Sequence, residues 1–381
     1  MLVSHCDVIV IGAGIVGAAC AHELSRAGCA VTVLDDRRGG ATQAGMGHLV
    51  VMDDDAAEFA LARASMQRWQ AWREQLPAAC AYSPTGTLWL AANDNELAEA
   101  QRKHHRLAAG GVHSELLDAV ALAAEEPALT HDLAGGLRVP ADAIVYAPAV
   151  ADWLLASAPR PIVQRRATAE AITDDGVRLT DGTLLRAGAV VLAAGIDALA
   201  LCPELPLQAK KGHLVITDRL PTLIRHELVE LGYIASAHAR SGSSVAFNAQ
   251  PRPTGQLLIG SSRQFDSADA RIDHAILSRM LRRALRYLPA LADVPAIRSW
   301  TGLRPATPDG LPIIGRHPTR PRLWLALGHE GLGVTTAPGT AMLMAAAITG
   351  QGGLRELDAE PYRADRFAGL RARNGAVEIA A

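Results

Sequence analysis

Cysteine is scarce and scattered in this sequence. Its five cysteines, at positions 6, 20, 29, 80 and 202, form no CxxC pair, and none lies near a histidine at metal-ligand spacing. Small disulfide-linked folds have many paired cysteines, whereas zinc and iron–sulfur sites have clustered ones. The pattern therefore predicts neither a disulfide framework nor a metal centre.

The sequence also lacks a long block of like charge and a long apolar run. Its 37 basic and 39 acidic side chains leave a formal charge of -2, so we expect no nucleic-acid partner. The apolar start, residues 8–11, lacks the basic leader and cleavage site of a secretory signal. We therefore expect a cytoplasmic protein without a membrane span.

Hydrophobic residues, in contrast, are abundant. They make up 49% of the 381 residues, enough for a large core in a chain longer than one core usually supports. We therefore expect two connected domains.

A dinucleotide-binding fingerprint opens the chain. A β-branched run at 6–11, a helical pattern at 15–28 and a second run at 30–34 predict a β-α-β unit. Between the first two lie Gly12, Gly14 and Gly17, spaced as GxGxxG, where the helix N-terminus can bind pyrophosphate. Asp35, at the end of the second run, can accept the ribose hydroxyls, and Asp36 follows it either as an adenosine contact or as a solvated neighbour. An acid here argues against NADP but leaves FAD and NAD open.

Further elements follow from periodicity and turn residues. Predicted helices cover 56–75, 273–287 and 336–349, and two more helical segments lie between 80 and 135. Predicted strands cover 87–90, 189–194, 213–217, 228–235, 243–249, 256–260 and 323–327, with a hairpin of 177–180 and 183–185 across Asp181-Gly182.

Three more segments carry a resemblance to a known family. They are 40–49 (GATQAGMGHL), 190–195 (VVLAAG), and the pair 301–315 (TGLRPATPDGLPIIG) and 328–336 (GHEGLGVTT). With the fingerprint, they make the chain similar, over essentially its whole length, to the D-amino acid oxidase and glycine oxidase family of flavoproteins. One departure is Gln43, which stands where the family usually has serine.

The resemblance implies a noncovalent FAD, because no late cysteine resembles a flavin tether. It implies a fold of class α/β, with a Rossmann-type FAD-binding domain and an interleaved α+β substrate domain on a large mixed or antiparallel sheet. We assign 1–80, 136–206 and 304–381 to the first domain, and 81–135 and 207–303 to the second. The implied cofactor-binding residues are Gly12, Gly14, Ile15, Val16, Gly17, Asp35, Asp36, Thr42, Gln43, Gly45, Met46, Gly47, His48, Leu49, Ala194, Gly195, Arg304, Gly331, Leu332, Gly333, Val334 and Thr335.

The resemblance also supplies substrate-site candidates. Arg304 stands where the family carries its carboxylate-binding arginine, whose planar fork can make two parallel bonds. Further catalytic candidates are His48, Tyr233 and His329. Each could equally be a hydrogen-bonded residue that lines the site without taking part in the chemistry. Asn248 and Lys211 are weaker candidates in the substrate sheet.

The implied activity is oxidation of a small amino or imino acid by hydride transfer from the α carbon to flavin N5. Stretches such as 45–55, 142–153 and 247–265 most resemble bacterial D-hydroxyproline dehydrogenase flavoprotein subunits. A D-hydroxyproline or related D-proline is therefore the expected substrate, with electrons passing to a carrier or partner. Three alternatives stay open: a glycine or D-amino acid oxidase that makes hydrogen peroxide, a flavoprotein subunit that shares its chemistry with a partner chain, and a plain NAD dehydrogenase.

Overall fold

A computed structural model describes residues 6–220, 222–232, 242–265, 267–352 and 357–367. Contacts divide the chain into two compact units. The first unit comprises Met1–Gly39, Ala151–Gln208 and Arg304–Ala381, and the second comprises Gly40–Val150 and Ala209–Leu303. Residues 40–80 and 136–150, which we assigned to the FAD-binding domain, thus group with the second unit by contacts. Which unit holds which ligand stays a prediction.

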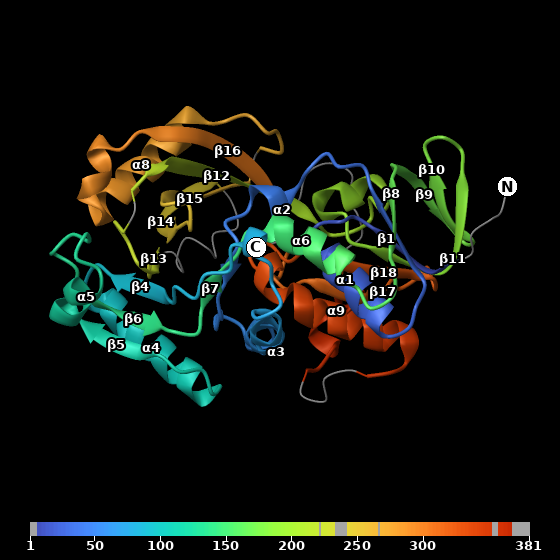
Figure 1. The fold of residues 1–381 in the computed structure, drawn as a ribbon, viewed down its shortest axis with the longest axis horizontal. Coiled ribbons are helices and arrows are strands. Elements are labelled where there is room, and N and C mark those ends of the chain that lie inside the picture. The colour runs from blue at the N-terminus through green and yellow to red at the C-terminus, as the bar shows by residue number, and fades with distance from the viewer. Residues whose placement is uncertain (1–5, 221, 233–241, 266, 353–356, 368–381) are drawn as a thin grey trace, which may run out of the picture. The chain divides into compact units, whose positions relative to one another are not determined.

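The first unit is built on a twisted, mainly parallel sheet with the strand order β17-β18-β11-β1-β2-β8 (Figure 1). In it β1 pairs in parallel with β2 and β11, and β17 is the antiparallel edge strand. Its elements are β1 (Cys6–Ile11), α1 (Ile15–Arg26), β2 (Val31–Asp35), β8 (Val163–Arg166), β9 (Ala169–Thr173), β10 (Gly176–Leu179), β11 (Leu184–Leu192), η2 (Gly195–Ala200), β17 (Ile313–Arg316), β18 (Leu323–Leu327), α9 (Gly333–Thr349), η4 (Glu360–Tyr362) and η5 (Ala364–Phe367).

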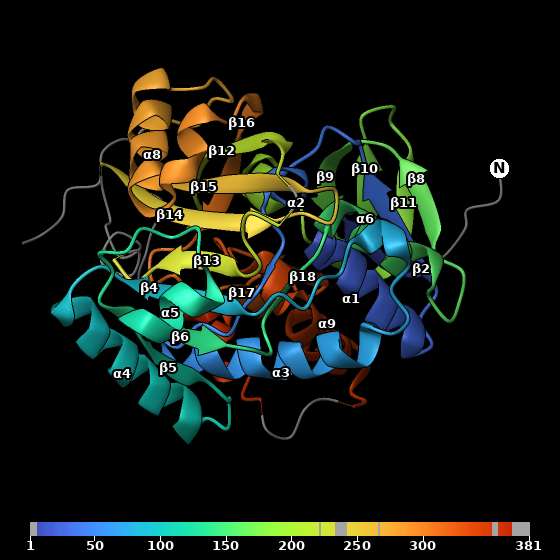
Figure 2. The ribbon, with the colours of Figure 1, turned by 60° about the vertical axis from the view of Figure 1, so that its left-hand side comes forward.

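Small residues let α1 and α9 pack side by side in this unit (Figures 1 and 2). Ala18, Ala19 and Ala21 of α1 are fully buried, as are Ala337 and Ala341 of α9. Short side chains let helix backbones approach closely, so the sequence of α9 suits burial on several sides rather than an exposed surface. A separate core cluster includes Ile9 and Ile11 of β1.

The second unit contains a mixed sheet with the order β16-β12-β15-β14-β13-β4-β6-β5. Its elements are α2 (Ala41–Ala44), β3 (His48–Leu49), α3 (Ala56–Trp72), η1 (Ala78–Cys80), β4 (Thr87–Ala91), α4 (Asp94–Ala109), β5 (Glu115–Asp118), α5 (Ala119–Glu125), β6 (Gly135–Val139), β7 (Ala143–Ile144), β12 (Gln208–Arg219), β13 (Glu227–Glu230), β14 (Ser243–Pro251), β15 (Gln256–Gln264), α8 (His274–Tyr287), η3 (Pro289–Asp293) and β16 (Ala296–Ala306). Helix α6 (Ala147–Ala156) and the last residues of β16 cross from one unit to the other along the chain.

The two faces of this second sheet differ in polarity. Helix α8 covers one face of this sheet (Figure 2). On that face Leu88, Leu228 and Phe247 share a hydrophobic cluster with residues of α8, and the Tyr287 ring of α8 stacks on that of Phe247 at 4.7 Å between centroids. Because strand residues alternate between faces, their neighbours Thr87, Glu227 and Asn248 lie on the other face. The second sheet therefore has an apolar face under α8 and an opposite face with buried polar side chains.

The predicted fold class is confirmed, including the β-α-β unit and the hairpin between β10 and β11. Several boundaries differ. Helix α1 ends at Arg26, with Gly28 in the turn beyond it, α3 ends at Trp72, and α9 begins three residues earlier than expected. The second hairpin strand and the buried strand 189–194 form one strand, β11, because nothing in residues 184–192 breaks its pairing. The glycine-rich segment 40–49 includes the short helix α2. No helix in the described ranges is long and apolar enough to cross a bilayer.

Candidate functional site

The turn after β1 packs closely against the end of β11, which requires glycine at position 12. Gly12 has φ +105°, and a Cβ built on it would lie 2.5 Å from the carbonyl oxygen of Ala193. Any larger residue would therefore be strained and would also clash with the end of β11. Gly14 then precedes α1 without offering a side-chain cap. The N-terminal turn of α1, with Ile15, Val16 and Gly17, thus relies on partners other than a capping side chain for its amide groups.

Asp35 closes this turn from the end of β2. Its Oδ2 accepts a hydrogen bond from the Ala13 amide, and its Oδ1 accepts one from the Arg37 amide, both at 2.7 Å. Each carboxylate oxygen has a second lone pair, so two further donors can still bind. The carboxylate therefore both fixes the glycine turn and fits a pair of ribose hydroxyls.

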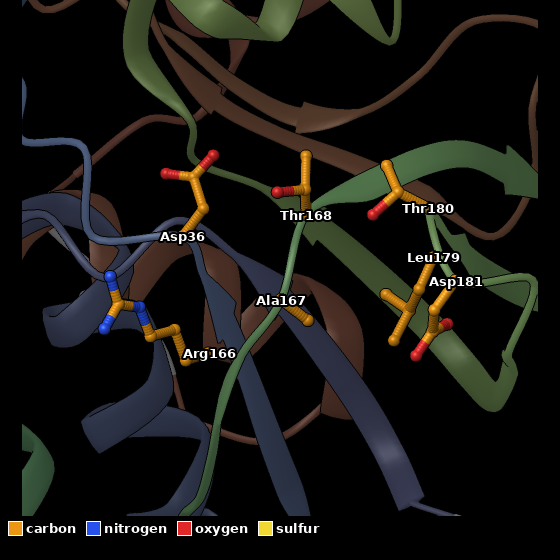
Figure 3. A pocket seen from close by; sticks show the side chains of 7 residues that line it. All are labelled: Asp36, Arg166, Ala167, Thr168, Leu179, Thr180 and Asp181. Atoms are coloured by element: carbon orange, nitrogen blue, oxygen red, sulfur yellow. The ribbon is translucent and has the colours of Figure 1, made fainter.

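A hollow of about 370 Å³ lies beyond the carboxyl ends of β2 and β8 (Figure 3). Asp36 and Arg166 lie at one end of it and Thr180 and Asp181 at the other, with Ala167 and Thr168 between and Leu179 in its wall. Clefts at the carboxyl ends of parallel strands are the usual ligand sites of open α/β sheets. Asp36 thus lines a hollow next to the fingerprint, although it also binds Arg38.

The last glycine turn, residues 328–333, leads into α9 close to the start of α1. A Cβ built on Gly333 would lie 3.9 Å from Cγ2 of Val16, so the N-termini of the two helices converge within the first unit. Leu332 precedes α9 and provides no side-chain cap. Helix N-termini carry partial positive charge, so this convergence favours a ligand with negative charge in more than one place.

His329 lies in this turn and is buried. Its Nε2 lies 2.9 Å from the Thr340 hydroxyl, and burial lowers the pKa of His329 to about 3. The ring is therefore neutral at physiological pH. The structure places it as a hydrogen-bonded anchor between the turn and α9, and an acid–base role for it stays a prediction.

These features fit FAD. The turn at residues 12–14, called the Gly12 cradle from here on, and the α1 N-terminus suit a pyrophosphate. Asp35 suits a ribose, and the α9 N-terminus suits the flavin pyrimidine, where negative charge builds up on reduction. Ala194 follows the end of β11, with its Cα 3.1 Å from a Cβ built on Gly12, and Gly195 begins η2. Gly331, Leu332, Gly333, Val334 and Thr335 form the α9 turn. The first unit thus brings the glycine turn, Asp35, the end of β11 and the α9 turn close to one another, while FAD binding by these residues stays a prediction.

The other predicted cofactor loop lies in the second unit. Gly47 has φ +87°, and a Cβ on it would clash with the carbonyl of Val145, so this glycine is required by the pairing of β3 with β7. Met46 packs against Leu214 and Leu258, and Leu49 is fully buried. Thr42 and Gln43 lie within α2, and Gly45 follows it. Contact of this loop with a flavin stays a prediction.

His48 stands at the centre of a polar cluster on the second sheet. Its Nδ1 forms a hydrogen bond with Oε1 of Glu227 and lies 2.8 Å from Nε2 of Gln250. Its Nε2 lies 3.3 Å from the amide nitrogen of Asn248. The His48 side chain is 20% exposed and that of Glu227 is fully buried, so the histidine is the accessible end of the cluster.

A second carboxyl group lies behind this cluster. Asp142 is buried, and burial together with the charge of Glu227 raises its pKa to about 8, although Thr87, Lys103 and the Val51 amide oppose the shift. Neither of its carboxyl oxygens makes a well-formed hydrogen bond within the described residues. Asp142 therefore carries its proton at neutral pH.

Arg304 lies on β16, partly buried, at the point in the sequence where the second unit gives way to the first. The strand end just beyond it is tied to the last glycine turn, because Ala306 bridges to His329 and the Glu330 amide donates to the carbonyl of Pro305. Tyr233 lies outside the described residues. Lys211 forms an ordinary ion pair with Asp269 at 2.8 Å, so it has a structural explanation.

Glu227 and Gln250 were missed by sequence reasoning. The strand segment 226–231 (HELVEL) puts two carboxylates into an otherwise apolar strand, and 247–250 (FNAQ) alternates apolar and amide residues. Glutamate is depleted in strands and is rarely buried without a partner. These two anomalies could have indicated a buried polar face. Among the described residues, no group of histidine, cysteine and acidic side chains is arranged to hold a metal ion.

Comparison with known proteins gives consistent matches. The model of the family DAO, "FAD dependent oxidoreductase", matches residues 7–347. Glycine oxidase from Pseudomonas aeruginosa is 30% identical over 387 residues, covering 93% of this chain and 97% of that protein. The crystal structure of glycine oxidase from Geobacillus kaustophilus matches with a TM-score of 0.84 at 26% identity, over 95% of this chain and 99% of that one.

Two further relatives are organised differently. The bifunctional protein ThiO/ThiG from Nostoc sp. is 30% identical over 365 residues and 91% of this chain, but this chain spans only 53% of that protein. Hydrogen cyanide synthase subunit HcnC from Pseudomonas aeruginosa is 26% identical over 417 residues, covering 95% of this chain and 96% of that protein, and its name makes it one subunit of an enzyme.

Proposed function

We propose a reaction for this chain on the premise that it belongs to the DAO family of FAD dependent oxidoreductases, whose model matches residues 7–347. The reaction is oxidation of a small amino or imino acid at the carbon next to nitrogen, which gives an imine. The proposal that FAD is the cofactor rests on one observation, the convergence of the α1 and α9 N-termini beside the Gly12 cradle and Asp35. The amino-acid part is supported by the resemblance at Arg304 and by the likeness to two glycine oxidases.

Each group of residues has a proposed task. When bound, FAD supplies the hydride acceptor. The first unit, with Gly12 to Gly17, Asp35 and the α9 turn, holds the cofactor without a covalent bond. Arg304 binds the substrate carboxylate through its planar fork, which fixes orientation as well as distance. The polar face of the second sheet, with His48 as its accessible end, binds the rest of the substrate.

D-hydroxyproline, or a related D-proline, is the substrate we favour, because residues 45–55 and 247–265 resemble those of D-hydroxyproline dehydrogenase flavoprotein subunits. Asn248 and Gln250 lie in the second stretch and His48 in the first, so the resemblance falls on the polar cluster. Glycine is the main competitor, with oxygen as acceptor and hydrogen peroxide as product, as in an oxidase.

A second candidate is a flavoprotein subunit that passes electrons to a partner chain. It is favoured by the relative named hydrogen cyanide synthase subunit HcnC, of whose length the match covers 96%. An oxygen electrode, compared with an artificial dye acceptor, distinguishes an oxidase from a dehydrogenase, and co-purification identifies a partner subunit. Location in the cytoplasm stays a prediction.

Anaerobic flavin bleaching tests the proposal. The purified protein should be yellow, and its flavin absorption should fall on mixing with D-hydroxyproline, a D-proline, glycine, sarcosine or another D-amino acid. Bleaching by none of these, nor by the L-amino acids, would contradict the amino-acid reaction. A colourless protein that binds NAD would instead support the nicotinamide alternative, and flavin that stays with the denatured chain would contradict noncovalent binding.

Arg304 provides the sharpest single-residue test. Arg304→Ala should raise the KM for the substrate about a hundredfold, in the range for a lost charge-assisted pair, with the flavin content unchanged. Arg304→Lys should recover only part of this, since an ammonium lacks the planar fork. The matched control is Arg298→Ala on the same strand, whose guanidinium lies 5.6 Å from the centre of the Trp300 ring. Loss of flavin with an unchanged KM in the residual holoenzyme would refute the assignment.

A further inference from the structure

The hydrogen bonds around His48 fix where its ring hydrogen lies. Nδ1 faces Oε1 of the fully buried Glu227. A carboxylate only accepts hydrogen bonds, so Nδ1 must carry the hydrogen. The side-chain amide of Gln250, whose Nε2 lies 2.8 Å from the same Nδ1, cannot also donate there. The nitrogen and oxygen of a side-chain amide have nearly the same shape, so the Gln250 amide can be turned by 180° to place its oxygen against Nδ1. In the opposite orientation this oxygen is buried and has no hydrogen-bond partner among the described residues.

With the hydrogen on Nδ1, the other ring nitrogen is left as a base. Nε2 is contacted by the amide nitrogen of Asn248 at 3.3 Å, which is long for a hydrogen bond and easily exchanged for a better donor. The ring is the exposed end of the cluster, while Glu227, Gln250 and Asn248 are all buried. A ligand that approaches the polar face of the second sheet therefore meets the histidine first.

The charged groups packed around the pair come from several elements. Glu227 on β13 faces the ring, and its second carboxyl oxygen is buried, with no hydrogen-bond partner in the part of the chain that the structure describes. Asp142, before β7, interacts with Glu227. Lys103 on α4 is neutralised by the buried Asp53, and Arg252 donates to the carbonyl of Met46 at 3.4 Å. Glu227 is thus the charge that these contacts place directly against the ring.

We propose that Glu227 is the positioning residue that holds the hydrogen of His48 on Nδ1, so that Nε2 accepts a proton from the ammonium group of the substrate. This rests on the proposed function, because only an amino or imino acid brings such a group. In the step, one N–H bond of the substrate breaks, its electron pair stays on the substrate nitrogen, and an Nε2–H bond forms. Glu227 then balances the charge of the imidazolium, which returns its proton to solvent through the exposed edge of the ring.

Proton transfer to His48 predicts a pH dependence of kcat/KM that a purely structural role of the His48–Glu227 pair would not produce. Oxidation needs the neutral amine, so the base matters only while the substrate arrives protonated. His48→Gln and Glu227→Gln should lower kcat/KM about a hundredfold at neutral pH, within the usual range for a general base. The deficit should vanish above the pKa of the free substrate amine. A deficit that stays constant over the whole pH range would overturn the proposal.

Glu230→Gln is the matched control. Glu230 lies on the same strand and is equally buried, but it binds Arg283 and Tyr287 rather than His48. Any loss of activity in this variant should be independent of pH. If Glu227→Gln fails to fold, His48→Gln still tests the base, because its side chain is partly exposed.

Nitrogen NMR of the holoenzyme with isotope-labelled histidine shows which ring nitrogen of His48 carries the hydrogen, without any turnover of substrate. The signals of His48 are those that disappear in the His48→Gln variant. The wild type should show hydrogen on Nδ1 and a bare Nε2, and Glu227→Gln should shift the hydrogen to Nε2. A wild-type ring with its single hydrogen on Nε2 would overturn the proposal. If no amino or imino acid bleaches the flavin, the proposed function and the proton transfer fail together, whereas the NMR result for the pair stands.

Discussion

Gly12 shows how a single backbone position can decide cofactor binding. Gly12→Val would combine a strained φ of +105° with a Cβ 2.5 Å from the Ala193 oxygen, so the turn must move away from its position before α1. We expect a protein without flavin absorption and with a lower Tm. Gly28→Val is the control, because Gly28 has a similar φ of +94° but open space around it. Equal flavin contents in the two variants would contradict the role of the cradle.

The raised pKa of Asp142 predicts how the free energy of unfolding depends on pH. Because its pKa in the folded protein is raised to about 8, the folded state binds a proton that the unfolded state releases above its ordinary pKa near 4. Stability should therefore fall by up to about 1.4 kcal/mol for each pH unit as the pH rises from about 4 to 8, through this group alone. Above about pH 8 the contribution levels off.

Asp142→Asn removes this titration while keeping the shape of the side chain. Denaturant unfolding of the variant between pH 5 and 8 should show a flatter loss of stability with rising pH than the wild type, and higher stability at pH 8. Identical pH dependences in the two proteins would mean that Asp142 is ionised in the folded state, contrary to its burial.

Some residues of the candidate site could be predicted from the sequence, and others could not. Gly12 and Asp35 could be predicted because the geometry of a β-α-β turn fixes both their spacing and their chemistry. Glu227 could not be assigned a role, since its partner His48 lies 179 residues away and only the fold brings them together. Tyr233 falls outside the described residues, so its role stays a prediction.

Helices and strands depend on local signals, and α3 provides a clean test of one. Asp55 caps this helix by accepting hydrogen bonds from the amides of Ala57 at 2.7 Å and Glu58 at 3.1 Å. Asp55→Ala should lower the free energy of unfolding by about 1 kcal/mol without changing the flavin content. Asp55→Ser keeps a capping oxygen and should recover most of the loss. A neutral Asp55→Ala variant would show that packing alone holds the helix end.

Element types were predictable where the pattern was long and regular, as in α3, α8 and the strands β12, β14 and β15 of the second sheet. Boundaries were not, because tertiary packing extends or shortens them. Helix α9 begins at Gly333 rather than near 336, since its first turn is supported by contact with α1 and not by its own sequence. Strand β11 continues through Gly188, where the sequence shows a break between two strands, because β1 pairs along it.

For the chain as a whole, the predicted cofactor residues are divided between the two units. Gly12 to Gly17, Asp35, Gly195 and the α9 turn belong to the first, whereas residues 42–49 belong to the second. A single cofactor that contacts both sets must link the two units thermodynamically. By mass action, it should stabilise the chain by about 2.7 kcal/mol at a concentration a hundred times its Kd.

Hydrogen exchange of the apoprotein, with and without FAD, tests this linkage. FAD should raise the Tm and slow exchange of backbone amides both in residues 12–17 and in residues 45–49, because ligand contact reduces local opening. NAD at the same concentration is the control and should do neither. Slower exchange confined to residues 12–17 and the α9 turn would mean that FAD is held by the first unit alone, and the assignment of Gly45 to Leu49 as a flavin contact would then be wrong.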